Sequence, residues 1–333
     1  STNTLGAAIG CFAAGYYLLS ELGVQYTLNV AAVSYLVAAV SGLLAYLLRE
    51  PVPAEAPADR SPSEAPDPGV KRFLYTATFA IGFVSLAYEV LLTRISILYL
   101  GNTVSVFPLV LTSFLLGSGI SAIVGTWLFG KMQPHGKSGR IFGVSAAVAG
   151  FLLMVTPYML LSDRVIGHQR FARFADAATA SPVPILAILI LPLIFIGGLL
   201  PLAIRMLQPE GRSAATRGAA TLYSLNTAGG LVGAGIANHY LVPAIGLQAT
   251  LALLSGTLLL IAAANLVDLK SGTKRLLPAV SVVVFLVIVA VWGLPNMTLM
   301  YAGKVASSTE AERVDIKYTR EGRAANVTVL DQF

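Results

Sequence analysis

The sequence predicts an all-α polytopic membrane protein with about nine transmembrane helices. Hydrophobic residues make up 56% of the chain and charged residues only 11%, whereas soluble proteins carry about 25% charged residues. Apolar runs of roughly 20 residues recur along the chain, and each is long enough to cross a bilayer core of ~30 Å. A third observation, a segment that occurs twice, indicates a duplicated helix bundle.

The duplicated segment comprises residues 3–28 and 226–251, which align at a constant offset of 223 with eleven of 26 positions identical. The identical pairs are Asn3/Asn226, Thr4/Thr227, Gly6/Gly229, Gly10/Gly233, Ala14/Ala237, Tyr17/Tyr240, Leu18/Leu241, Gly23/Gly246, Gln25/Gln248, Thr27/Thr250 and Leu28/Leu251. Small residues at spacing four let helix backbones approach closely. The repeated glycine pairs, and a stripe formed by Gly117, Ser121 and Gly125, are therefore predicted to be packing faces.

Nine apolar segments are predicted to form the helices. In chain order they cover residues 4–20, 26–48, 72–98, 104–130, 141–161, 184–207, 217–241, 247–267 and 276–293. Residues 49–71 contain six prolines and no apolar face, which predicts a disordered linker. Residues 294–333 turn polar, and the alternation on both sides of Glu321-Gly322 predicts a strand pair that starts a short soluble β segment.

Lys and Arg gather in alternate loops. The loops at 49–72, 131–140, 205–217 and 270–275 are basic, whereas the turns after the first, third and seventh helices contain no Lys or Arg. The loop at 163–182, with three arginines, is the exception. The positive-inside rule therefore places the basic loops in the cytoplasm, which predicts a bacterial or archaeal inner (plasma) membrane protein with its C-terminal segment outside.

Glu89 is the first candidate functional residue, because a carboxylate inside a transmembrane helix is costly and is a functional-site hypothesis by default. It is expected either to tie its helix to the helix at 217–241 or to bind a substrate or proton. Tyr88 directly precedes it. Arg94 lies about 140° around the same helix from Glu89, and we expect its side chain to extend to the membrane interface.

Asn226 and His239 are further candidates on the helix at 217–241. The asparagine recurs as Asn3, which favours a polar contact at matching bundle positions. His239 is expected to be a hydrogen-bonded interface residue, since no second histidine or cysteine lies at ligand spacing and no metal site is expected.

The helix at 184–207 is the best candidate for a broken helix. Its apolar run is interrupted by Pro192, Gly197, Gly198 and Pro201 within ten residues. Proline removes an amide donor and tilts the helix axis. Carbonyl groups freed in mid-membrane can line a cavity, as in transporters, although a simple kink fits the same pattern.

Three stretches together resemble the membrane-embedded spermidine synthase-like proteins, in which a major-facilitator-like bundle is fused to an aminopropyltransferase-like domain. These stretches are GFVSLAYEVLLTRI (82–95) with FLLGSGISAIVG (114–125), LPLIFIGGLLPLAIR (191–205) with YSLNTAGGLVGA (223–234), and REGRAANVTVLDQ (320–332). The resemblance implies halves of six helices each. Residues 1–48 would then be the last two helices of a first half, 72–268 the second half, 276–293 an extra helix and 294–333 the start of the synthase-like domain.

The same resemblance implies transferase chemistry on polyamines, but the catalytic core is not in this chain. No catalytic residue and no cofactor is therefore expected here, and the chain would anchor an attached domain or feed substrate to it. Two alternatives stay open: a secondary transporter of small cationic or polar solutes, and a structural subunit of a larger membrane complex. The expected partners are the lipid bilayer and either missing parts of the same protein or other membrane subunits. The basic residues lie at helix ends, so no nucleic-acid partner is expected.

Overall fold

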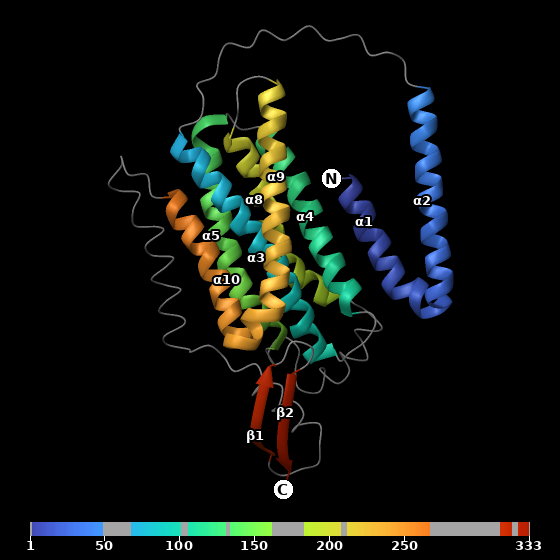
Figure 1. The fold of residues 1–333 in the computed structure, drawn as a ribbon, viewed down its shortest axis with the longest axis vertical. Coiled ribbons are helices and arrows are strands. Elements are labelled where there is room, and N and C mark those ends of the chain that lie inside the picture. The colour runs from blue at the N-terminus through green and yellow to red at the C-terminus, as the bar shows by residue number, and fades with distance from the viewer. Residues whose placement is uncertain are drawn as a thin grey trace.

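The computed structural model describes residues 2–48, 68–100, 106–130, 134–161, 183–207, 212–266, 314–321 and 326–332. In this part of the chain, a helical bundle is followed by a two-stranded sheet that lies at one end of it (Figure 1). The helices are α1 (Thr2–Ala13), η1 (Ala14–Leu22), α2 (Gly23–Leu47), α3 (Pro68–Leu100), α4 (Val106–Gly130), α5 (Pro134–Leu161), α8 (Val183–Leu207), α9 (Arg212–Ile236), η2 (Ala237–Leu241) and α10 (Val242–Leu266).

Eight of the nine predicted helical segments coincide with these helices, and the ninth, residues 276–293, lies outside the described residues. Within the described residues, six helical runs are long and apolar enough to cross a membrane. Two of them, Asn3–Leu47 with 45 residues and Thr216–Asn265 with 50, would measure about 68 and 75 Å as straight helices. Both exceed twice the bilayer core of ~30 Å, and each folds back on itself into two antiparallel helices (Figure 1).

The two fold-back points are equivalent positions of the sequence repeat. Gly23 and Gly246 have φ angles of 75° and 82° and ψ angles of 176° and 167°, a backbone region that is essentially restricted to glycine. In each copy a π-helix precedes this glycine, η1 and η2, and both begin at the repeated alanine. The duplication therefore extends from the sequence to the geometry of the turn.

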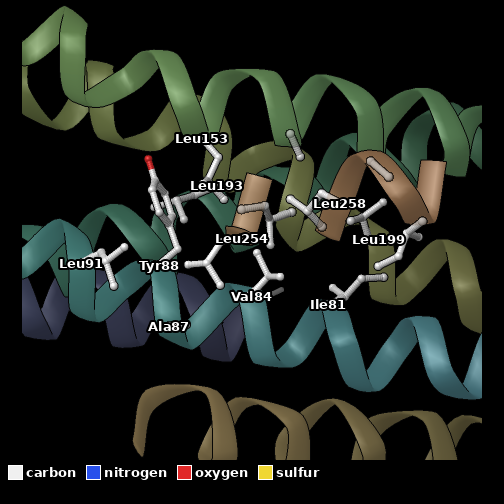
Figure 2. Packing of buried hydrophobic residues seen from close by; sticks show 14 of the residues in the cluster. Ile81, Val84, Ala87, Tyr88, Leu91, Leu153, Leu193, Leu199, Leu254 and Leu258 are labelled. Carbon is white, nitrogen blue, oxygen red and sulfur yellow. The ribbon is translucent and has the colours of Figure 1, made fainter. Parts of the chain in front are cut away.

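The core lies between α3, α5, α8 and α10. Buried side chains of α3 meet Leu153 of α5, Leu193 of α8 and Leu254 of α10 (Figure 2). On another face, α3 packs against α9, while α4 lies between α8 and α1 (Figure 1). The α1–α2 hairpin sits at the edge of the bundle, and no residue of α2 is buried.

Glycine residues allow the backbones of α3 and α9 to pack closely together. A Cβ atom at Gly229 or Gly233 would collide with the main-chain carbonyl oxygen of Phe79 or Phe83, and one at Gly82 would collide with that of Asn226. The predicted packing role of the second glycine pair is therefore confirmed. In the first copy the result differs, because a Cβ at Gly6 or Gly10 would meet no described atom within 4 Å.

Helix α8 is continuous from Val183 to Leu207, with Pro192 and Pro201 inside it. The helix is therefore not broken here, and the alternative of a simple kink stays a prediction. Gly197 and Gly198 instead accommodate α4, since their Cβ atoms would lie 2.8 Å from Ser118 Cα and 2.6 Å from Ser121 Oγ, respectively. These glycines, together with the small residues of α4, form a packing face between two helices of the bundle.

Strands β1 (Val314–Glu321) and β2 (Asn326–Gln332) pair in antiparallel fashion. The register runs from Val314 opposite Gln332 to Glu321 opposite Asn326, with an irregularity between Ile316 and Tyr318. The pair lies at the end of the bundle where α9 ends and α10 begins, whereas α10 ends at the opposite end (Figure 1).

The positive φ angle at Gly246 predicts a specific cost of substitution. Replacing Gly246 with Ala should destabilise the bundle by about 1–3 kcal/mol, because an L side chain is strained in this backbone region. Thermal unfolding in detergent measures the effect. Gly256→Ala in the same helix is the matched control, since a Cβ there meets nothing within 4 Å, and it should leave stability unchanged or raise it. Equal melting temperatures for the two variants would contradict the assignment of strain to Gly246.

Candidate functional site

Two ionisable side chains interrupt the apolar surface of α3 in its last third, where the helix runs beside α9 and η2. Glu89 and Arg94 are both partly buried. Ionisable groups inside membrane helices usually face the bundle interior and mark binding or translocation sites. We therefore take this part of α3 as the candidate functional site.

Arg94 is bound across the helix interface to Asn238, the second residue of η2. Its Nε and Nη2 atoms donate to Asn238 Oδ1 at 3.1 and 2.7 Å, so two N–H groups of one guanidinium converge on one oxygen. The expectation that Arg94 extends to the membrane interface is thus replaced by an interhelical contact. The sequence gives one indication of a role for Asn238: this position is polar in the second copy of the repeat, whereas the equivalent residue of the first copy is Gly15.

The side chain of Glu89 makes no hydrogen bond or ion pair with any residue that the structure describes. Only its main-chain carbonyl is engaged, accepting from Thr93 Oγ1 at 3.0 Å. The tie between α3 and the helix at 217–241 that was expected of Glu89 is made by Arg94 instead. A partly buried carboxylate is therefore left available on the same helix as an arginine that is already bound.

Tyr88 belongs to the hydrophobic core and not to this site. Its ring is fully buried and points from α3 towards α5, with Leu153 and Leu193 nearby (Figure 2). Its hydroxyl lies beside Thr156 of α5, yet neither hydroxyl has a well-formed hydrogen bond within the described residues. Successive helix positions are about 100° apart, which explains why the side chains of Tyr88 and Glu89 have different surroundings.

Asn226 and His239 do not join Glu89 and Arg94. The main-chain carbonyl of Asn226 lies against Gly82, and its side chain forms no hydrogen bond with the described residues. His239 is exposed, and its Nδ1 lies 3.0 Å from the carbonyl oxygen of Gly235 in its own helix. Asn226 is about 18 Å along the helix from Asn238, so the repeated asparagine and the one that binds Arg94 are separate features.

Several other buried polar atoms also lack a hydrogen bond within the described part of the bundle. They are Thr78 Oγ1, Ser96 Oγ, Thr112 Oγ1 and Gln248 Nε2. In a membrane interior an unsatisfied polar group is costly. Small hydroxyl residues are common in helices for packing, so the sequence carried no signal for the three hydroxyls, whereas Gln248 is an identical position of the repeat.

The described residues contain no group of three or more His, Cys, Asp or Glu side chains that could hold a metal ion. Comparison with protein-family models, with curated protein sequences and with solved structures finds no match to this chain. The family resemblance thus stays an expectation, and the proposals below rest on the residues of the site.

The contact between Arg94 and Asn238 can be measured by a double-mutant cycle. Arg94→Met, Asn238→Ala and the double variant should give a coupling free energy of about 1–2 kcal/mol in detergent unfolding. The expected value is at this level because the donor in both hydrogen bonds is a charged guanidinium. Asn226→Ala, combined with Arg94→Met, is the control and should show additive effects. Additive effects for Asn238 as well would mean that the contact contributes nothing to stability.

Proposed function

We propose that this chain is a membrane-embedded binding unit for a small cationic or polar solute, of the kind found in secondary transporters. One observation carries the proposal: Glu89 places a partly buried carboxylate within a long apolar helix, with no partner among the described residues. An anionic group left unpaired in such surroundings favours a cation or a proton as its ligand.

The surroundings of Glu89 support this role. Arg94 lies five residues further along α3. Its two hydrogen bonds to Asn238 hold the guanidinium in place. Next to it, Asn238 lies in η2, and single π-turns inside helices occur frequently at functional sites. A carboxylate and a fixed cation therefore lie five residues apart on α3, and the cation is held by a residue of the irregular helix η2.

The direct test is Glu89→Gln, which removes the charge and keeps the shape of the side chain. In proteoliposomes, uptake of labelled spermidine and proton flux reported by an internal pH dye should each fall at least tenfold. Glu21→Gln is the matched control, because Glu21 is exposed at the α1–α2 turn, and its flux should equal that of the unmodified protein. Equal flux for Glu89→Gln and the unmodified protein would remove Glu89 from the mechanism.

A second candidate function is the membrane anchor of an extramembrane, synthase-like domain that transfers groups to polyamines. It is favoured by the antiparallel pair β1–β2 at the end of the bundle where α9 ends and α10 begins (Figure 1). The start of α5, the end of α8 and the start of α9, which carry Lys and Arg residues, lie at the other end. The arrangement supports an external position for the strands by the positive-inside rule.

Sidedness is testable with single cysteines in a Cys11→Ser background. Thr319→Cys in β1 should react with a membrane-impermeant maleimide in intact cells, since the strands are proposed to lie outside. Lys137→Cys, at the start of α5, should react only after the membrane is opened. Protection of the Thr319→Cys protein in intact cells would place the strands in the cytoplasm and contradict the external domain.

A further inference from the structure

One face of α3 carries a polar or very small residue on every turn, and Glu89 is one of them. These residues follow one another at intervals of three or four positions, which places them on one side of the helix, within an arc of about 80°. From first to last they extend over about 27 Å, nearly the ~30 Å of a bilayer core. This polar stripe consists of Thr78, Gly82, Ser85, Glu89, Thr93 and Ser96.

The polar stripe lies between two packed faces of α3. At one edge of the stripe, Gly82 packs against the main chain of Asn226 in α9. Most of the way around the helix from α9, Val84 and Tyr88 face the hydrophobic core that α3 shares with α5, α8 and α10 (Figure 2). The stripe is therefore distinct from the α9 contact and from the core, and it is the polar side of an otherwise apolar helix.

Two hydroxyl groups of the stripe are buried without a partner. Thr78 and Ser96 are 0% and 2% exposed, and the Oγ atoms of both lack a hydrogen bond within the described residues. Close helix packing explains why these residues are small, but alanine or glycine would serve packing equally well. A hydroxyl donates one hydrogen bond and accepts two, so it can hold a water molecule where an alanine cannot.

We propose that the polar stripe is the route by which protons reach Glu89. The proposal rests on the proposed function, because Glu89 is the group that receives the proton. From Ser85 to Ser96, successive polar members are about 4.5–6 Å apart along the helix axis, close to the distance that one water molecule spans with two hydrogen bonds of ~2.8 Å each. The interval from Thr78 to Ser85, about 10.5 Å, takes a short row of waters.

Proton transfer along this row needs no other reactant. Each hydroxyl accepts a proton from the water on one side and passes its own proton to the water on the other side, so it stays neutral. The last transfer forms the O–H bond of the Glu89 carboxylic acid, and release of that proton restores the carboxylate. A larger solute does not fit along the stripe, since even a Cβ atom at Gly82 would collide with the carbonyl oxygen of Asn226.

Thiol accessibility tests the route in the protein reconstituted in liposomes, in a Cys11→Ser background. Ser85→Cys and Ser96→Cys should react at least tenfold faster with 2-aminoethyl methanethiosulfonate than the controls do, because this reagent attacks thiolates that are in contact with water. Ala77→Cys and Ala87→Cys are the matched controls on the core side of α3, since these alanines are 3% and 0% exposed. Equal rates at all four positions would overturn the proposal.

Proton flux, reported by an internal pH dye, tests the hydroxyls themselves. Thr78→Val and Ser96→Ala remove one hydroxyl each, and each should lower the flux at least threefold. Thr76→Val is the matched control, because Thr76 is exposed and its hydroxyl bonds to the carbonyl oxygens of Arg72 and Phe73 in its own helix, and its flux should equal that of the unmodified protein. Unchanged flux in both stripe variants would contradict the route.

Conservative variants separate a lost hydroxyl from a folding defect. Thr78→Ser and Ser96→Thr keep the hydroxyl and should retain the flux, and a loss as large as in Thr78→Val and Ser96→Ala would overturn the proposal. The outcomes also distinguish the route from the proposed function. If Glu89→Gln stops the flux while the stripe cysteines are inert, the function of Glu89 stands and the route is wrong. If the cysteines react but Glu89→Gln conducts normally, the proposed function fails, and the stripe does not lead protons to Glu89.

Discussion

The close contact between the backbones of α3 and α9 is the constraint on which the rest of the bundle depends. Glycines at positions 82, 229 and 233 remove the side chains that would keep the two helices apart, and in a membrane such contacts provide association through van der Waals packing. Because α9 is held against one face of α3, the opposite face is free to pack with α5, α8 and α10. The buried core around Tyr88 follows from this division of the α3 surface.

The same contact explains the polar site. With the two helices held together by glycines, the η2 turn brings Asn238 within hydrogen-bond distance of Arg94. The guanidinium is thereby held inside the bundle, and Glu89, about 140° around the helix from Arg94, stays unpaired among the described residues. Packing and chemistry are therefore linked, since a looser α3–α9 contact would separate the arginine from its partner.

Helix positions were predictable because each depends on a local apolar run, and the role of Gly229 and Gly233 followed from their spacing. Two features were not predictable, for physical reasons. The proline and glycine residues of α8 indicated a break, yet the helix is continuous through them, whereas Gly23 and Gly246 lie in turns between predicted helices and their positive φ angles were not predicted. Burial of the repeated residues also depends on which helix lies alongside, which explains why Leu28 and Leu251 are identical in sequence and opposite in exposure.

The two matching turns have a consequence for how the helix pairs form. Both copies have a π-helix followed by a glycine with positive φ, although α10 packs inside the bundle while α2 has no buried residue. The same turn thus forms in two different surroundings, η1 against α4 and η2 against α3, which favours the local sequence as its main determinant. A turn set mainly by its local sequence can close early, so each pair of helices can form as a hairpin before the bundle assembles around it.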